Sequence, residues 1–443
     1  MEWSRLICNK RFGLENYHDP RNRGSRSEFQ RDHDRLVFSS PFRRLQNKTQ
    51  VFPLPGSIFV HNRLTHSLEV SCVGRSMANE ISARLRRKYG NESWSDMLDG
   101  LGEITGAACL AHDLGNPPFG HSGENAISTF FSRGGGMYLQ DNIDEPQWND
   151  LIHFEGNANS FRVLTHRFQG RRTGGFAMTY STLASIVKYP YESSAARENG
   201  KFGFFTSERE SFMKIADELG LKRLDGESLA YARHPIVYIV EAADDICYEV
   251  MDIEDAHKLK ILTTEEVIER FQAFFPDERI KEMEGVMETI HDPNEKVSYL
   301  RSCVIGRLVE KCADVFVENE AEILDGTFSG SLISHLPERE KDAYGKCVEL
   351  SYERIYSASS VVDVELAGYR ILTSLMEILV DAVRNPGHSY SKLLLSKIPS
   401  QYDIRNPELF GRIQAVLDYI SGMTDVYALD LFRKLQGQSL PAV

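Results

Sequence analysis

Apolar residues recur at helical spacing along almost the whole chain, and this pattern is the feature that most limits its fold. The clearest segment is 235–258, which begins with a proline, a residue favoured in the first turn of a helix. Similar spacing over 64–89, 102–114, 368–383 and 407–434 predicts further helices. The chain is therefore expected to be an all-α protein of about fifteen or more helices.

Patterns typical of strands are few. Segment 51–60 contains two prolines and a glycine, so we expect at most a short β-hairpin there, and 201–206 is predicted to form a small strand. A helix should open at Ser122 or Gly123. Three consecutive glycines make 134–146 a predicted loop, and the alternating charges of 260–350 indicate surface helices.

Length and composition limit the class of protein. The 443 residues suggest two or three lobes, and 42% hydrophobic with 26% charged residues is typical of a soluble globular protein. No apolar run approaches the ~18 residues of a membrane span, and no apolar stretch follows the N-terminus as in a signal peptide. We therefore expect no membrane association. The seven cysteines are scattered without a CxxC pair, which argues against a disulfide framework and favours a reducing cytoplasm.

Charge is unevenly distributed along the chain. The net charge is -13, yet residues 1–50 hold eleven Lys and Arg against six acids, among them Arg21 and Arg23. This distribution favours a local site for an anion over a general nucleic-acid surface. The alternative, that these arginines only solvate a loop, stays open at this point.

Residues able to bind a metal gather around one rigid turn. The run HDLGNPPFGHSGE over 112–124 combines two histidines, two carboxylates, and glycines and prolines that fix the backbone. His66 lies near the start of an earlier predicted helix, and Asp244-Asp245 lies inside the 235–258 helix. A lone His-Asp pair is usually structural, but the combination predicts a metal site.

Helical geometry ranks the two adjacent aspartates. The apolar stripe of the 235–258 helix is centred near Ala243. At ~100° per residue, Asp244 falls at the edge of the stripe and Asp245 on the opposite side. A carboxylate at the edge of a buried stripe is costly unless it is paired or bound to metal, so Asp244 is the better ligand. Tyr248 and Asp252 follow along the same flank.

Two histidines and two aspartates form a mixed nitrogen and oxygen ligand set. Mn or Mg are the favoured ions, and Co, Fe, Ni or Zn also fit such a set, whereas ions that prefer thiolates do not. A bound divalent ion can polarise a phosphoryl oxygen and lower the pKa of a bound water. This chemistry suits hydrolysis of a phosphate ester.

The series His66, His112-Asp113, Asp244 resembles the H…HD…D signature of HD-domain phosphohydrolases. Five flanking segments, spread over nearly the whole chain, are similar to the bacterial dGTP triphosphohydrolases: 63–70, 115–124, 154–158, 241–248 and 418–425. The resemblance implies an HD-type helical core with extra helical lobes. It also implies hydrolysis of a deoxynucleoside triphosphate, with dGTP favoured, to deoxynucleoside and tripolyphosphate.

Carried over by position, the resemblance assigns a role to each residue that matches a motif. His66, His112, Asp113 and Asp244 would bind the metal, and His121 and Glu124 would form the catalytic pair. The residues implied in substrate binding are Arg63 and Lys188 for phosphate, Tyr248 and Asp252 for the deoxyribose, Arg44 and Gln46 for the base, and Asn116 in the central turn.

The resemblance also divides the chain. Residues 1–60 would form a basic segment and part of the active-site wall, 61–260 the catalytic core, and 261–443 a C-terminal lobe that completes the substrate site and makes oligomer contacts. Asn116 and Phe154 stand where some relatives carry histidines, which argues against a second proton relay.

The resemblance implies that the protein forms homo-oligomers, often hexamers. It also implies a nucleotide or single-stranded DNA as an effector. Two alternatives stay open: another HD-type nucleotidase or phosphodiesterase, and a helical protein that binds single-stranded nucleic acid through its basic segment.

Overall fold

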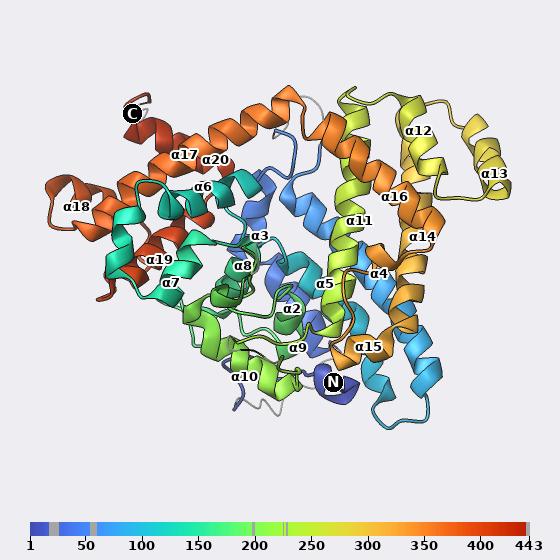
Figure 1. Ribbon diagram of the computed structural model, residues 1–443, viewed down its shortest axis with the longest axis horizontal. Helices are drawn as coiled ribbons and strands as arrows, with labels where there is room; N and C mark the ends of the chain where they lie inside the picture. The colour runs from blue at the N-terminus through green and yellow to red at the C-terminus, as the bar shows by residue number, and fades with distance from the viewer. Residues whose placement is uncertain (17–25, 54–59, 197–199, 225, 227–228, 440–443) are drawn as a thin grey trace.

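The computed structural model describes residues 1–16, 26–53, 60–196, 200–224, 226 and 229–439. In this part of the chain the regular structure is helical, with isolated bridges such as Thr49 to Asn62 and no named strand. The prediction of an all-α fold is therefore confirmed (Figure 1). Among the described helices, none is both long and apolar enough to cross a membrane.

The α-helices follow one another along the chain and vary from one turn to more than seven. In order they are α1 (Trp3–Leu6), α2 (Glu28–Val37), α3 (Ser40–Arg44), α4 (Arg63–Tyr89), α5 (Leu101–Ala111), α6 (Gly120–Ser132), α7 (Glu145–Ile152), α8 (Gly156–Thr165), α9 (Tyr180–Ser185), α10 (Arg209–Leu219), α11 (Pro235–Lys258), α12 (Thr264–Gln272), α13 (Asp277–Glu288), α14 (Pro293–Glu318), α15 (Glu320–Asp325), α16 (Glu338–Leu350), α17 (Ser359–Arg384), α18 (Ser389–Leu395), α19 (Leu409–Ser421) and α20 (Asp425–Leu435).

Short helical turns connect several of these helices. They are η1 (Leu45–Asn47), η2 (Ser95–Gly100), η3 (Met137–Asn142), η4 (Ser193–Ala195), η5 (Thr206–Glu208), η6 (Ile333–His335) and η7 (Ser351–Ile355), the last being a π-helical turn.

The centre of the molecule is the packing of α4, α5 and α11 (Figure 1). Every residue of α5 except Glu103 is buried, because α2, α4, α9 and α11 pack around it. Gly74 allows α4 to approach closely, since a Cβ there would lie 2.6 Å from the Cys109 Sγ. This packing brings the start of α4, the end of α5 and the middle of α11 together.

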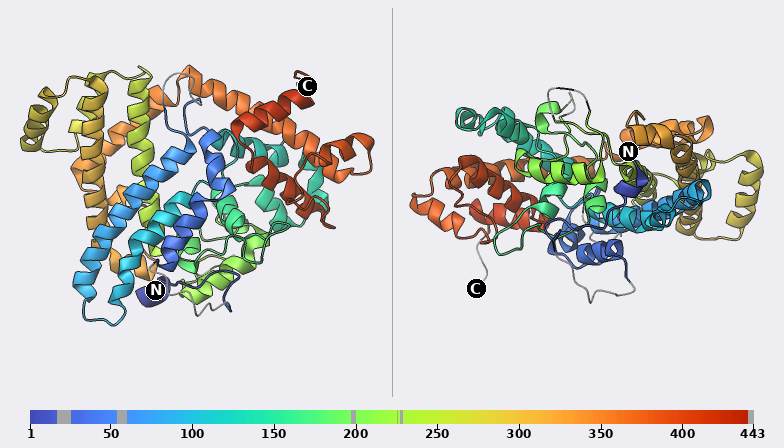
Figure 2. Two further views of the ribbon diagram at one scale, coloured as in Figure 1. Left: turned by 180° about the vertical axis from the view of Figure 1, so that it is seen from behind. Right: turned by 90° about the horizontal axis from the view of Figure 1, so that it is seen from below.

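A second apolar cluster lies away from the α4, α5 and α11 centre, toward the end of the long axis that carries α18 (Figure 1). It joins α6 and α7 to α17 and α19, with Phe131, Leu372 and Ile413 fully buried. Helix α17 crosses the molecule and links this end to the α12–α16 end (Figures 1 and 2). The division of the chain at residues 60 and 260 stays a prediction.

Several local predictions differ from the structure. The segment predicted as one helix over 407–434 is two, α19 and α20, separated at Gly422–Thr424, where the Thr424 side chain caps α20. Segment 201–205 is not a strand, and the predicted loop over 134–146 contains η3. Helix α5 ends at Ala111, three residues earlier than predicted. The centre of the predicted hairpin, 54–59, and Arg21 and Arg23 lie outside the described residues.

Candidate metal and phosphate site

The start of α4 presents two side chains to the centre of the molecule. Asn62 caps this helix, and its side-chain oxygen accepts hydrogen bonds from the backbone N–H groups of Leu64 and Thr65, each at 3.0 Å. The cap sets the helix start so that Arg63 and His66, one turn apart, share a face. Both side chains are buried.

His112 and Asp113 follow the last residue of α5 and are held by α8. The Ser160 hydroxyl donates to the His112 carbonyl at 2.7 Å and accepts from the Gly115 N–H at 2.9 Å. Gly115 is required here, because a Cβ would lie 2.1 Å from the Ser160 backbone nitrogen. The Asn159 side chain donates to the Gly115 carbonyl at 2.7 Å, so two neighbouring residues of α8 hold the turn.

The next turn of the same motif adopts an uncommon backbone conformation. Phe119 has a φ of 62° in the left-handed region, and its N–H donates to Asp425 Oδ1 at 3.0 Å. Asp425 also accepts from the Thr49 N–H at 2.7 Å. A carboxylate at the start of α20 therefore ties the central motif to the segment that follows η1.

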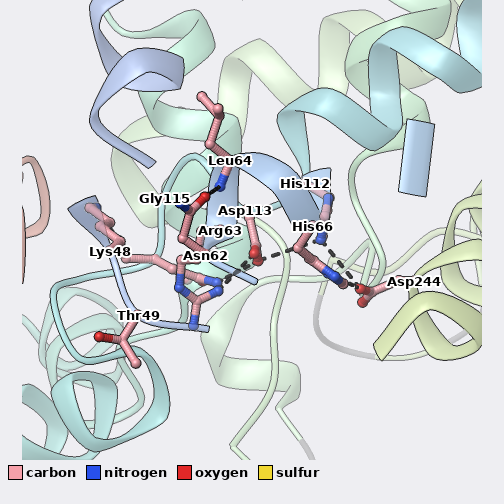
Figure 3. A network of polar contacts seen from close by, with 12 residues as sticks. Lys48, Thr49, Asn62, Arg63, Leu64, His66, His112, Asp113, Gly115 and Asp244 are labelled. Atoms are coloured by element: carbon pink, nitrogen blue, oxygen red, sulfur yellow. Dashed lines mark hydrogen bonds and ion pairs between the residues drawn. The ribbon is translucent and has the colours of Figure 1, made fainter. Parts of the chain in front are cut away.

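Asp244 from α11 meets both histidines. Its Oδ1 lies 3.0 Å from His66 Nε2 and 3.4 Å from His112 Nε2, and Figure 3 shows both imidazoles directed toward it. One nitrogen or oxygen atom each from His66, His112 and Asp113 lie within 4.8 Å of one another. The four residues predicted as metal ligands are thus brought together from α4, α11 and the turn that follows α5.

The donor set fits a divalent metal ion. The His112 Nδ1 lies 2.6 Å from the Cys109 carbonyl, so in the neutral imidazole that a metal binds this nitrogen is the donor and Nε2 carries the lone pair. Nε2 is buried with no hydrogen-bond partner in the described part of the chain, although carboxylate oxygens of Asp113 and Asp244 lie 3.5 and 3.4 Å away. An unpartnered imidazole nitrogen beside two carboxylates is the arrangement that a metal would satisfy.

Electrostatics at this cluster favour charged carboxylates. Burial opposes ionisation of Asp113, but the charge of Arg63, whose Nη1 lies 2.7 Å from Oδ2, lowers the pKa of that carboxyl. Burial also opposes protonation of His112, yet Asp113 and Asp244 raise its pKa to about 9. The other carboxylate oxygen, Asp113 Oδ1, accepts a hydrogen bond from the Asn116 side chain at 2.6 Å, and this bond orients the carboxylate.

Cationic side chains flank the cluster. Burial opposes the charge on Lys188, but Glu241, at 3.2 Å from its Nζ, and the more distant Asp245 and Asp244 raise the pKa of Lys188. Arg63 is 4% exposed, and its Nε has no hydrogen-bond partner among the described residues. Both side chains can offer N–H groups to an anion.

His121 and Glu124 lie on the first turns of α6. The His121 side chain is exposed, and surrounding atoms together with the charges of Arg63 and Lys201 lower its pKa. Glu124 accepts from the Gly156 N–H at 2.8 Å and lies 3.7 Å from Lys201 Nζ. No hydrogen bond joins the two side chains in the described structure.

Tyr248 and Asp252 continue along the α11 flank from Asp244. The Tyr248 ring lies edge-on to His66, with centroids 6.3 Å apart. Asp252 is buried and accepts from the Tyr356 hydroxyl at 3.0 Å, and the Tyr356 ring packs against Tyr248. Burial raises the pKa of Asp252 well above its usual range. These aromatic rings and the acid form one wall beside the histidines.

Comparisons with known proteins agree with this geometry. A model of the HD domain matches residues 63–143, and a model of the phosphohydrolase-associated domain matches residues 335–434. A deoxyguanosinetriphosphate triphosphohydrolase-like protein of Synechocystis sp. is 36% identical over 99% of this chain and 100% of its own length. One of Pseudomonas aeruginosa is also 36% identical, over the full length of both chains. The deoxyguanosinetriphosphate triphosphohydrolase of Yersinia pestis is 30% identical over 92% of this chain and 93% of its own length.

The chain belongs to the deoxyguanosinetriphosphate triphosphohydrolase family. The matched HD domain of this family includes His66, His112, Asp113, His121 and Glu124, and Asp244 joins them from α11, outside the matched range. The resemblance to this family inferred from the sequence motifs is confirmed.

The two residues expected to contact the nucleobase, Arg44 and Gln46, are not part of the metal cluster. Gln46 is exposed. Arg44 lines a cavity that contains none of the four proposed metal ligands. Gln50, four residues after Gln46, has a buried side-chain oxygen without a hydrogen-bond partner among the described residues. The base contacts of this family member therefore stay a prediction, with Gln50 as an added candidate.

Lys48 and Tyr356 were missed by sequence reasoning. Lys48 is 2% exposed, and its ammonium donates to the backbone carbonyls of Asn116 at 2.5 Å and Ser421 at 2.7 Å. Lys48 directly follows η1, and no periodic pattern marks it as buried. Tyr356 comes from the distant turn after η7, so only the tertiary fold places it beside Tyr248 and Asp252.

Proposed function

We propose that the protein hydrolyses deoxynucleoside triphosphates, with dGTP as the favoured substrate, to deoxynucleoside and tripolyphosphate. The observation that carries this proposal is the cluster of His66, His112, Asp113 and Asp244, with Arg63 and Lys188 beside it. The names of the full-length relatives support the substrate. In this reaction water adds to the α-phosphorus, the bond to the 5'-oxygen breaks, and the 5'-oxygen takes up a proton.

A metal ion held by the four ligands would polarise a phosphoryl oxygen and activate water, and Mn or Mg are the proposed ions, with Co, Fe, Ni and Zn also compatible. Arg63 and Lys188 would bind the triphosphate and offset its charge. His121 would donate the proton to the departing 5'-oxygen. Glu124 would act on His121 only after a movement that brings them together, since no hydrogen bond links them in the described structure.

The wall of Tyr248, Asp252 and Tyr356 is proposed to bind the sugar. Tyr248 would lie against C2' of the deoxyribose, where a 2'-hydroxyl would clash, and Asp252 would accept a hydrogen bond from the 3'-hydroxyl. The Tyr356 hydroxyl, bonded to Asp252, would orient that carboxyl. These contacts would select deoxynucleotides over ribonucleotides.

The remaining expectations are part of the same proposal. Residues 61–260 would carry the catalytic core, with 1–60 and 261–443 completing the substrate site. The protein would act in the cytoplasm as a homo-oligomer, with a hexamer as one form and a nucleotide or single-stranded DNA as effector.

The deciding experiment incubates the purified protein with each of the four dNTPs and with GTP, in Mn or Mg, and resolves the products. We expect deoxynucleoside and tripolyphosphate, fastest from dGTP, and no turnover of GTP. Release of phosphate or pyrophosphate would replace the proposal with another HD-type nucleotidase or phosphodiesterase activity. No turnover of single or mixed nucleotides would favour a protein that binds single-stranded nucleic acid.

A further inference from the structure

The cavity lined by Arg44 also contains Lys48 and none of the four proposed metal ligands. Its volume is about 110 Å³. Residues from α3, α8, the end of α19 and several connecting segments line it, among them Arg44, Lys48, Arg171, Tyr402 and Ser421. Leu114, which directly follows Asp113, also lines this cavity, so it lies close behind the metal cluster.

Three cations line this cavity, and none of them forms an ion pair with a described residue. Neither Arg44 nor Arg171 makes an ion pair or a side-chain hydrogen bond within the described part of the chain. Arg171 instead lies over the rings of Phe176 and Phe168, 4.6 and 5.7 Å from their centroids. The ammonium of Lys48 contacts two backbone carbonyls, which use two of its three N–H donors.

The carboxylate of Asp418 does not neutralise these cations. Asp418 is the one acidic residue among the described residues that line the cavity. Both of its oxygens accept from the Arg162 guanidinium, each at 2.8 Å, and this arginine also contacts Glu208 at 2.5 Å. Asp418 is thus fully engaged by a buried arginine, and the cavity keeps its positive charge.

Unused hydrogen-bonding capacity accompanies the positive charge. The Ser421 side chain is 3% exposed, and its hydroxyl has no hydrogen-bond partner in the described structure. A buried polar atom without a partner costs free energy, so such an atom in a polar cavity indicates a missing ligand.

Without a bound anion, the positive charges at this cavity are destabilised. Burial, together with the charge of Arg44, lowers the pKa of Lys48 to about 7. Burial lowers the pKa of Arg44, and burial and the Arg44 charge lower the pKa of Arg171. Each of these cations would gain from a nearby negative charge.

We propose that this cavity is a binding site for a tetrahedral oxyanion of the size of phosphate or sulfate, held by Arg44, Arg171, Lys48 and Ser421. Its volume is well below the ~300 Å³ at which pockets for whole organic ligands begin, so a nucleoside does not fit inside. The oxyanion is either a free ion or the phosphate group of a nucleotide whose remainder lies outside. Guanidinium and ammonium groups with a hydroxyl are the usual donors to such oxygens.

The test measures thermal unfolding of the metal-free protein while sulfate or orthophosphate is titrated at constant ionic strength set with chloride. We expect a saturable rise in Tm that chloride does not produce. Arg44→Gln combined with Arg171→Gln should weaken the apparent affinity at least tenfold, and Ser421→Ala should weaken it less. The exposed Arg87→Gln serves as the matched control and should respond like the wild type.

Further measurements test where the oxyanion binds and whether it is a free ion or part of a nucleotide. Lys188→Gln should keep the response, since Lys188 does not line the cavity. If dGMP competes with sulfate more strongly than orthophosphate does, the oxyanion is the phosphate group of a nucleotide. If dGMP competes equally or less strongly, the oxyanion is the free ion. Without added oxyanion, the double variant should unfold at the same or a higher temperature, because it removes unpaired cations. An equal oxyanion response in the wild type and the double variant would overturn the proposal.

Discussion

His66 Nε2 lies 3.0 Å from Asp244 Oδ1, although 178 positions separate the two residues in the chain. The contact joins the first turn of α4 to the middle of α11. It completes the cluster with His112 and Asp113, which directly follow α5. Because the two histidines share one carboxylate, removing Asp244 affects both at once.

Asp244→Asn should therefore lower the affinity for Mn by more than the ~10–100-fold typical of losing a partner outside the ligand shell, and abolish dNTP hydrolysis. Calorimetric titration with Mn and the product assay measure the two effects. The neighbouring Asp245→Asn is the matched control, because Asp244 and not Asp245 pairs with His66 and His112 among the described contacts. Undiminished Mn affinity in Asp244→Asn would remove Asp244 from the ligand set.

His121 should give the pH profile of kcat/KM a descending limb. Desolvation by surrounding atoms and the charges of Arg63 and Lys201 lower its pKa, which favours the neutral imidazole in the ligand-free protein. If His121 donates a proton, kcat/KM falls about tenfold per pH unit above that pKa, which lies below the usual ~6.5.

Two variants test this assignment. Lys201→Gln removes a charge that lowers the pKa of His121 and should shift the limb to higher pH. His121→Ala should remove the limb and most turnover while Mn still binds. Near-wild-type turnover of His121→Ala with metal bound would exclude His121 as the proton donor.

His61 should make stability depend on pH between about 6.5 and 10. Burial opposes its charge, but Asp255, 2.8 Å from Nδ1, and Glu69, 3.0 Å from Nε2, raise the pKa of His61 to about 10. The folded state thus holds a proton that the unfolded chain releases near pH 6.5. The stabilisation is complete below pH 6.5 and is lost as the pH rises through 10.

Urea unfolding at pH 6 and pH 10 measures this effect. His61→Gln should be less stable than the wild type by on the order of 2 kcal/mol at pH 6, and the difference should shrink at pH 10. A difference that is the same at both pH values would mean that the stabilisation does not depend on the charge of His61.

The parts of the site that could be predicted from sequence carry local signals. The choice of Asp244 over Asp245 follows from the apolar stripe of one helix, and the turn after His112 is marked by its glycines and prolines. Lys48 and Tyr356 carry no such signal, because their roles arise only where segments distant in sequence meet. The break between α19 and α20 was missed because the apolar spacing continues across Gly422.

Gly115→Ala should disrupt the turn that carries His112 and Asp113. A Cβ at this position would lie 2.1 Å from the Ser160 backbone nitrogen and 2.3 Å from the Gly156 carbonyl oxygen. Both atoms belong to the backbone of α8, which cannot move aside cheaply, so we expect a loss of about 1–3 kcal/mol in the free energy of unfolding. The shift of the turn should also lower kcat/KM for dGTP by ~100-fold, the effect of a misplacement of about 1 Å.

Gly306→Ala on α14 is the matched control for this substitution. Nothing lies within 4 Å of a Cβ there, so alanine should raise the free energy of unfolding by about 0.5–1 kcal/mol and leave hydrolysis unchanged. Urea unfolding and the dGTP assay on both variants separate a general effect of adding a methyl group from a specific one. If Gly115→Ala matched Gly306→Ala in both measurements, the close approach of α8 would not be what positions His112 and Asp113.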